Sequence, residues 1–134
     1  MRAAISKRYS FDAAHQLPDH DGKCARPHGH TYGLRIQIVG EILDSPGDPK
    51  NGMVLDYGEL DAIWKQSLEP RLDHRDLNLS LAGEAEPTSA ENIAAFILRE
   101  LVSRLPYGTE IEVGISETPK TEAIVHSRDL PSPG

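Results

Sequence analysis

Apolar and polar residues alternate along residues 5–15 and again along residues 28–42. A period of two indicates a β-strand with one buried face. In the first segment the apolar positions are odd and the series ends on His15, whereas in the second they are even and begin with His28 and His30. The sequence therefore predicts two strands, and it predicts that His28 and His30 project from the same face of the second one.

Two later segments repeat apolar residues every three or four positions, which is the period of a helix with one buried side. The first follows Asp56, which forms a capping arrangement with Glu59, and it is expected to end at Pro70. The second begins at the Thr-Ser-Ala-Glu sequence of residues 88–91, which has capping-box spacing, and ends before Pro106. The apolar positions are Leu60, Ile63, Trp64 and Leu68 in the first helix and Ile93, Phe96, Ile97 and Leu101 in the second.

Alternation returns near the C-terminal end, where residues 111–117 and 122–126 are expected to form two further strands. Polar segments rich in turn residues, 18–27 and 44–52, are expected to be loops, and residues 72–78 form a polar connection between the helices. The order is strand, strand, helix, helix, strand, strand. This order predicts an α+β fold with a four-stranded antiparallel sheet and two helices on one face.

Composition narrows the class of protein. A chain of 134 residues fits a single domain spanning 1–134, and its formal net charge of −7 argues against a nucleic-acid-binding surface. The sequence has neither a secretory signal nor a run of about 18 apolar residues that could span a membrane, so we expect a cytoplasmic protein without membrane contact. The single cysteine, Cys24, excludes an internal disulfide and any zinc site built from cysteine pairs.

Three histidines stand where the expected strands bring them together. His28 and His30 are separated by Gly29, which places their imidazoles about 6 to 7 Å apart along one face, close enough to share a metal ion. His15 ends the preceding strand and could supply a third ligand. Three protein ligands leave one position open, as in catalytic zinc sites, although imidazole also suits copper, iron and nickel. The alternative is a pair of hydrogen-bonded polar residues without a metal.

Four other residues are candidates for chemistry. Cys24 lies four positions before His28, and a nearby cation would favour its thiolate as a proton acceptor; alternatively it is a small buried residue. Asp73 and His74 are either an acid/base pair or a turn with local hydrogen bonds. Glu117 shares the parity of the buried positions of its strand, so it should point inward toward a donor-rich ligand rather than into solvent.

Six motifs, in order along nearly the whole chain, together resemble the 6-pyruvoyl-tetrahydropterin synthase superfamily. They are Phe11-Asp-Ala-Ala-His15, Cys24-Ala-Arg-Pro-His28-Gly-His30, Gly52-Met-Val-Leu-Asp56, Leu72-Asp-His74, Pro87-Thr-Ser-Ala-Glu-Asn92 and Glu117-Thr. The spacing Cys-x-x-x-His-Gly-His is similar to the branch of 6-carboxy-5,6,7,8-tetrahydropterin synthases, which act in the queuosine pathway. Ala90 departs from the family pattern by lengthening the Pro-Thr-Ser-Glu-Asn run by one residue.

The resemblance implies a fold, an assembly and a set of site residues. The fold is the tunnelling fold, in which sheets of several subunits form a barrel and active sites lie at subunit borders. The assembly is a homohexamer, in which His74 can serve the Cys24 of a neighbouring subunit. The implied site residues are His15, His28 and His30 for Zn²⁺, Cys24, Asp73 and His74 for catalysis, and Glu117, Ser89 and Glu91 for substrate, with Glu117 anchoring the pterin ring.

The resemblance also implies a reaction. The substrate is 7,8-dihydroneopterin triphosphate, and the product is 6-carboxy-5,6,7,8-tetrahydropterin, with release of acetaldehyde and triphosphate, for queuosine or other deazapurine biosynthesis. One alternative is the pyruvoyl branch, which eliminates triphosphate and keeps the side chain. Another is an aldolase-like cleavage that releases glycolaldehyde. A third is a non-catalytic module that binds a pterin or a metal.

Overall fold

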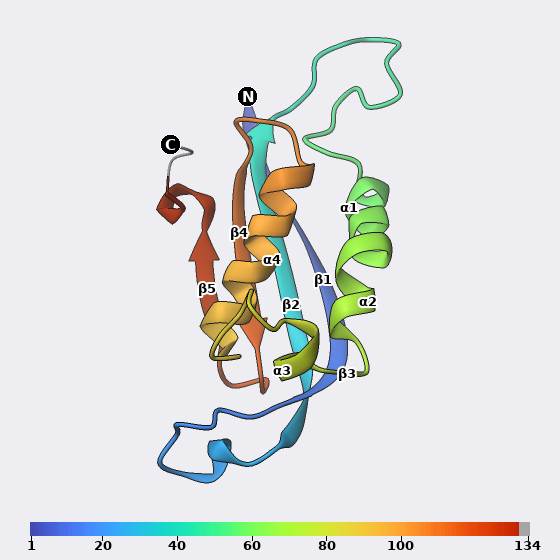
Figure 1. Cartoon of the computed structure of the whole chain (residues 1–134). Helices are drawn as coiled ribbons and strands as arrows, with labels where there is room; N and C mark the ends of the chain where they lie inside the picture. Colours follow the sequence, from blue (N-terminus) through green and yellow to red (C-terminus); the bar gives the residue numbers. More distant parts are fainter. Residues whose placement is uncertain (132–134) are drawn as a thin grey trace.

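One five-stranded sheet, in the order β3-β1-β2-β4-β5, forms the frame of the computed structural model, which describes residues 1–131 (Figure 1). The strands are β1 (Arg2–His15), β2 (His28–Glu41), β3 (Arg75–Asp76), β4 (Glu110–Ser116) and β5 (Ala123–His126). β1 and β2 form a long antiparallel hairpin whose register runs from Arg2 opposite Glu41 to His15 opposite His28. β2 pairs antiparallel with β4, and β4 pairs antiparallel with β5.

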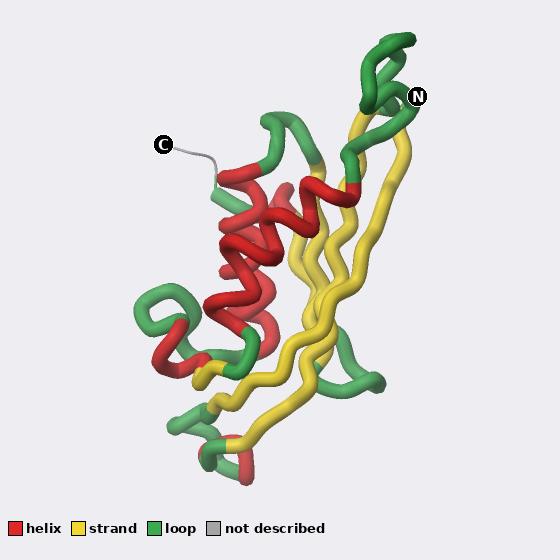
Figure 2. The backbone as a smooth tube through the Cα atoms, turned by 90° about the vertical axis from the view of Figure 1, so that its right-hand side faces the viewer, coloured by secondary structure: helices red, strands yellow, loops and turns green. Residues whose placement is uncertain are grey.

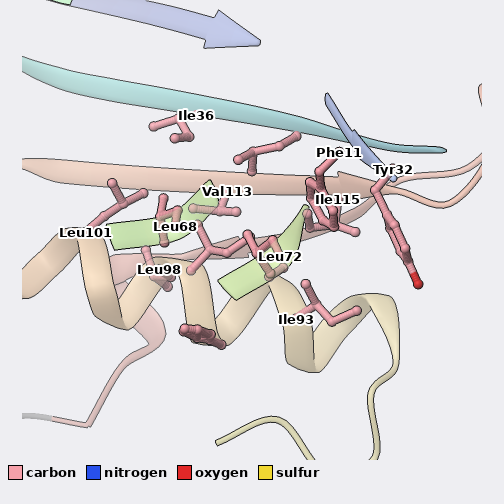
Figure 3. Packing of buried hydrophobic residues seen from close by; sticks show 14 of the residues in the cluster. Phe11, Tyr32, Ile36, Leu68, Leu72, Ile93, Leu98, Leu101, Val113 and Ile115 are labelled. Carbon is pink, nitrogen blue, oxygen red and sulfur yellow. The ribbon is translucent and has the colours of Figure 1, made fainter. Parts of the chain in front are cut away.

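Helices cover one face of this sheet. Figure 2 shows the longer helices gathered on one side of the strands, and the buried apolar side chains form a cluster between the two layers, part of which is drawn in Figure 3. The helical segments are α1 (Tyr57–Ile63), the π-helical turn η2 (Trp64–Leu68), α2 (Glu69–Leu72), α3 (Leu77–Ser80), α4 (Ala90–Arg104) and the 3₁₀ turns η1 (Lys23–Ala25) and η3 (Ser127–Asp129). Among the described residues, no helix is long and apolar enough to cross a membrane.

The structure confirms the α+β class, but the sheet has five strands rather than four and is mixed rather than wholly antiparallel. The additional strand, β3, pairs parallel with the end of β1, with Ala13 opposite Arg75 and Ala14 opposite Asp76. Two residues are too few to show a period of two in the sequence. The short strand exists because the polar connection follows the edge of β1, where the His74 backbone N–H donates to the Asp12 carbonyl at 2.6 Å.

The expected end of the first helix at Pro70 is wrong. The helical path continues from α1 through η2 into α2 and ends at Leu72. Pro70 lies in the first turn of α2, directly after the π-helical turn. Proline is common in the first turn of a helical segment, and the π-helical turn directly before Pro70 interrupts the regular α-helical hydrogen bonding.

The start of α4 also differs from the expected capping box. The N-cap is Ser89, whose hydroxyl accepts a hydrogen bond from the Asn92 backbone N–H at 3.2 Å. Thr88, expected to be the cap, is buried, and its hydroxyl lies within hydrogen-bond distance of the Gln16 carbonyl and the Asn78 side-chain oxygen. The inserted Ala90 is the first residue of the helix, so the cap is one position later than the spacing predicts.

The cap gives a prediction about stability. Changing Ser89 to alanine removes the acceptor for the Asn92 N–H, and we expect it to lower the free energy of unfolding by about 1 kcal/mol. Urea denaturation followed by circular dichroism measures this loss. Ser103→Ala, at the exposed C-terminal end of the same helix, is the matched control and should change stability by less than about 0.5 kcal/mol. Equal stability of Ser89→Ala and the wild type would contradict the capping role.

The hairpin positions the candidate site. Odd positions of β1 and even positions of β2 face the helices, and this face carries Phe11 and Tyr32 in the core. The same parity continues to the end of the hairpin, where it reaches His15 on β1 and His28 on β2. The histidines therefore lie on the core face at the end of the sheet, next to the loop that joins β1 to β2 (Figure 1).

Candidate metal centre

Four side chains converge at this end of the core face. One ligand atom from each of His15, His28, His30 and Glu117 lies within 4.8 Å of the other three. His15 comes from the last position of β1, His28 and His30 from the start of β2, and Glu117 from the bend directly after β4. The structure therefore brings together the three histidines selected from the sequence and adds a carboxylate to them.

Backbone carbonyls fix the orientation of two of the imidazoles. The Nδ1 atom of His15 lies 2.7 Å from the Thr88 carbonyl oxygen, and the Nδ1 atom of His28 lies 2.7 Å from the Arg26 carbonyl oxygen. A carbonyl oxygen only accepts hydrogen bonds, so each Nδ1 must carry the proton. In the neutral rings Nε2 then holds a lone pair, which is the arrangement that backbone carbonyls behind the ring impose on metal-binding histidines.

The Nε2 atoms of His15 and His30 are buried and make no hydrogen bond within the described residues. The carboxylate of Glu117 faces both, with Oε2 at 3.6 Å from His15 Nε2 and 3.0 Å from His30 Nε2. The lone pair of His15 Nε2 and the Glu117 carboxylate repel each other unless a cation lies between them. Burial also lowers the pKa of His30 and favours its neutral, metal-binding form, although the charge of Glu117 opposes this shift. The four side chains could hold a metal ion.

Cys24 is not a member of this cluster. It is half-buried in the η1 turn of the loop between β1 and β2, and its carbonyl accepts a hydrogen bond from the Leu17 backbone N–H at 2.7 Å, which ties the loop together. Its sulfur belongs to neither of the two groups of potential ligands in the described residues. Within one chain the structure therefore does not place the thiol against either set of ionisable groups.

Asp73 and His74 form a second group with Asp12 at the β3 edge of the sheet. His74 Nδ1 lies 3.0 Å from the Asp73 carboxylate, and Asp73 accepts a hydrogen bond from the Asp12 backbone N–H at 3.0 Å. His74 is exposed and has a positive φ of 58°, a strained conformation for a residue other than glycine that often marks functional positions. The pair is held rigidly by the edge of β1 but presents its imidazole to solvent.

The same contacts shift the pKa of both partners. The backbone hydrogen bond from Asp12 lowers the pKa of Asp73, and the hydrogen bond to Asp73 raises the pKa of His74. In Asp73→Asn we expect the pKa of His74 to fall, because the imidazolium loses its carboxylate partner, so the ring loses its proton at a lower pH. NMR titration of the His74 ring proton measures this shift. The control is Asp76→Asn, which removes the carboxylate that caps α3 and should leave the His74 titration unchanged. An unshifted His74 titration curve in Asp73→Asn would contradict the pairing of Asp73 with His74.

Two candidate substrate residues lie at the start of α4. The Ser89 hydroxyl is engaged in the helix cap, and Glu91 is exposed in the first turn. Neither touches the histidine cluster among the hydrogen bonds and ion pairs of the described residues. Their contact with substrate stays a prediction.

Sequence reasoning missed the groups that orient the imidazoles. The carbonyl oxygens of Thr88 and Arg26 are backbone atoms, and no residue type signals them. Tyr32 was not among the candidate site residues, yet its buried hydroxyl has no hydrogen-bond partner within the described residues, and Figure 3 shows it pointing away from the apolar cluster. Its ring centroid lies 5.9 Å from that of His15 and 5.3 Å from that of His30, and burial raises its pKa. Tyr32 follows His30 by two residues on the same strand, so the period of two could have placed its side chain on the face that carries the histidines.

Comparisons with known proteins identify the family of this chain. The sequence model of the family 6-pyruvoyl tetrahydropterin synthase matches residues 4–128. A 6-carboxy-5,6,7,8-tetrahydropterin synthase of Synechocystis is 45% identical to this chain, and the match covers 72% of this chain and 73% of the relative. The 6-pyruvoyl tetrahydrobiopterin synthase of Homo sapiens is 33% identical, and the match covers 87% of this chain and 86% of the human protein. The solved structure of Caenorhabditis elegans 6-pyruvoyl tetrahydropterin synthase superposes with a TM-score of 0.75 at 28% identity, covering 93% of this chain and 95% of that one. The chain therefore belongs to the 6-pyruvoyl tetrahydropterin synthase family.

Proposed function

We propose that this protein is a zinc-dependent 6-carboxy-5,6,7,8-tetrahydropterin synthase, a carbon–carbon lyase. It converts 7,8-dihydroneopterin triphosphate and water to 6-carboxy-5,6,7,8-tetrahydropterin, acetaldehyde and triphosphate. The observation that carries the proposal is the cluster of three imidazoles with Nε2 atoms that converge next to Glu117. The 45% identity to a Synechocystis relative of that name supports the carboxy branch over the pyruvoyl branch.

His15, His28 and His30 would hold the zinc ion. Imidazole and carboxylate groups are the common protein ligands of zinc, and a three-histidine set leaves a position for substrate. When bound, zinc acts as a Lewis acid and stabilises the negative charge that develops on the substrate's side-chain oxygen as a neighbouring C–H proton leaves. The carbonyl groups of Thr88 and Arg26 keep His15 and His28 in the tautomer that this requires.

Cys24, Asp73 and His74 would move the protons. We assign Cys24 as the group that takes the proton from the substrate side chain, and the Asp73–His74 pair as its acid/base partner. The raised pKa of His74 keeps its ring protonated to a higher pH than an isolated imidazole, which suits a proton donor. Glu117 would bind the pterin ring, because a carboxylate accepts two parallel hydrogen bonds from the ring amino group and the adjacent ring N–H.

A homohexamer would bring the two separated groups together. In the described chain the Asp73–His74 pair and the histidine cluster form distinct groups, and Cys24 joins neither. From Arg2 to Asp12 the outer edge of β1 has no neighbouring strand among residues 1–131. Such an edge presents free N–H and C=O groups that a second copy of the chain can pair with. We propose that the active sites form at these borders, with His74 of one subunit serving the Cys24 of another.

The cellular setting is part of the same proposal. We place the enzyme in the cytoplasm, where a free cysteine such as Cys24 stays reduced. The carboxylated pterin would then feed queuosine or another deazapurine pathway. Neither nucleic acid nor membrane is expected as a partner.

Release of acetaldehyde tests the proposed reaction. Zinc-loaded protein is incubated with 7,8-dihydroneopterin triphosphate, and acetaldehyde is measured through the oxidation of NADH by alcohol dehydrogenase. We expect acetaldehyde to form in proportion to the substrate consumed, to stop after metal removal with a chelator and to resume when zinc is added back. Substrate consumption without acetaldehyde would contradict the carboxy branch, and undiminished turnover without metal would contradict the role of the cluster.

A further inference from the structure

The carboxylate of Glu117 occupies the position of a fourth metal ligand. Its Oε2 atom lies 3.6 Å from His15 Nε2 and 3.0 Å from His30 Nε2. In a tetrahedral zinc centre with bonds of about 2.0 to 2.2 Å, neighbouring ligand atoms lie about 3.4 Å apart. The two distances fall on either side of this edge length. With His28 the set is complete, since all four ligand atoms lie within 4.8 Å of one another.

The ring-binding role of Glu117 requires a different position. In a dihydropterin the amino group and the adjacent ring N–H lie at one end of the bicyclic system, and the hydroxylated side chain leaves from the other end. A carboxylate that bonds a metal at the side-chain end cannot reach the amino end, because the full length of the ring system separates them. The two roles therefore exclude each other in any one conformation.

The surroundings of Glu117 allow it to move. It lies in a bend just beyond the last residue of β4, so no strand pairing fixes it. Its side chain is 31% exposed, its carboxylate makes no hydrogen bond within residues 1–131, and its ion-pair contacts are with the imidazoles of His15 and His30. By contrast, His15 is held by the Thr88 carbonyl and by burial. Rotation of the partly exposed Glu117 side chain can therefore remove its carboxylate from the cluster.

We propose that Glu117 closes the metal centre in the substrate-free enzyme and leaves it when substrate binds, exchanging the metal for the pterin ring. The second half of the exchange rests on the proposed function. The carboxylate holds the metal tightly between turnovers, and its departure opens the fourth position as the ring arrives. Binding of the pterin and opening of the metal centre then become a single event.

Metal affinity without substrate tests the first half. The variants are Glu117→Gln, which keeps the size of the side chain, and Glu110→Gln at the other end of β4, which removes an exposed carboxylate that forms an ion pair with Arg2. Zinc affinity is measured by competition with a chromophoric chelator. We expect Glu117→Gln to bind zinc at least about tenfold more weakly than the wild type, since changes even beyond the ligands themselves weaken metal binding about 10- to 100-fold. Glu110→Gln should match the wild type. Equal affinity in all three proteins would overturn the proposal without affecting the proposed reaction.

Cobalt-substituted protein tests the second half. The visible absorption of Co²⁺ depends on the number and type of its ligands. In the wild type we expect 7,8-dihydroneopterin to change this spectrum, and in Glu117→Gln we expect the spectrum to differ from the wild type before any pterin is added. Dihydroneopterin affinity should fall in Glu117→Gln as well. A Glu117→Gln spectrum identical to that of the wild type, or unchanged pterin affinity, would overturn the exchange. Wild-type protein that forms no acetaldehyde would overturn only the proposed reaction.

Discussion

Alanine in place of His30 is expected to lower zinc affinity by more than about 100-fold, because loss of a residue that only supports a ligand already costs about 10- to 100-fold. His30 is a member of the cluster, with its buried Nε2 3.0 Å from the Glu117 carboxylate and no hydrogen bond at that atom within the described chain. Its removal leaves two imidazoles and a mobile carboxylate. Metal content after dialysis, measured by inductively coupled plasma mass spectrometry, should be close to zero in His30→Ala.

His126→Ala is the matched control for this variant. His126 is also a histidine at the end of a strand, but its Nδ1 atom accepts a hydrogen bond from the Arg128 backbone N–H and belongs to no ligand group of residues 1–131. This variant should retain one metal per chain. A His30→Ala protein that keeps the wild-type metal content would show that the converging imidazoles do not hold the ion.

Cys24→Ser should remove nearly all turnover and leave the metal in place. Loss of a positioned proton-transfer group typically costs about 10²- to 10⁴-fold in rate, and a serine hydroxyl holds its proton too tightly to replace a thiol as acceptor. Metal content should be unchanged, because Cys24 lies outside the histidine cluster. The measurement is the rate of acetaldehyde formation in samples of equal zinc content.

The metal content decides how a loss of activity is understood. If Cys24→Ser loses its zinc together with its activity, the cysteine supports the metal centre rather than moving protons. If Cys24→Ser keeps both zinc and turnover, Cys24 is not catalytic, and another group must take the proton. Only loss of rate with zinc retained agrees with the assigned role.

Long regular elements could be predicted from the sequence, and short ones could not. The alternation along residues 5–15 and 28–42 predicted both strands, and the structure adds their register, with His15 opposite His28. β3 has two residues and exists only because a neighbouring edge pairs with it, so no local pattern marks it. The helix that continues past Pro70 depends on a π-helical turn, which is a property of the packed helix rather than of its composition.

The sequence pointed to the residues of the histidine cluster, but it did not show how their side chains are arranged. Parity placed His28 and His30 on one face and pointed Glu117 inward, and the structure has all three in one cluster. Parity does not say how far a side chain reaches, so it could not predict the approach of the Glu117 carboxylate to His15 and His30. The backbone carbonyls that orient His15 and His28 are likewise invisible to any motif, because every residue carries one.

The mass of the pterin product tests the central claim most directly. Zinc-loaded protein is incubated with 7,8-dihydroneopterin triphosphate under anaerobic conditions, and the pterins are separated and identified by mass spectrometry. We expect 6-carboxy-5,6,7,8-tetrahydropterin as the product, with its formation abolished in His30→Ala. A pterin that keeps its three-carbon side chain would assign the enzyme to the pyruvoyl branch, and unchanged substrate with zinc bound would contradict the enzymatic function altogether.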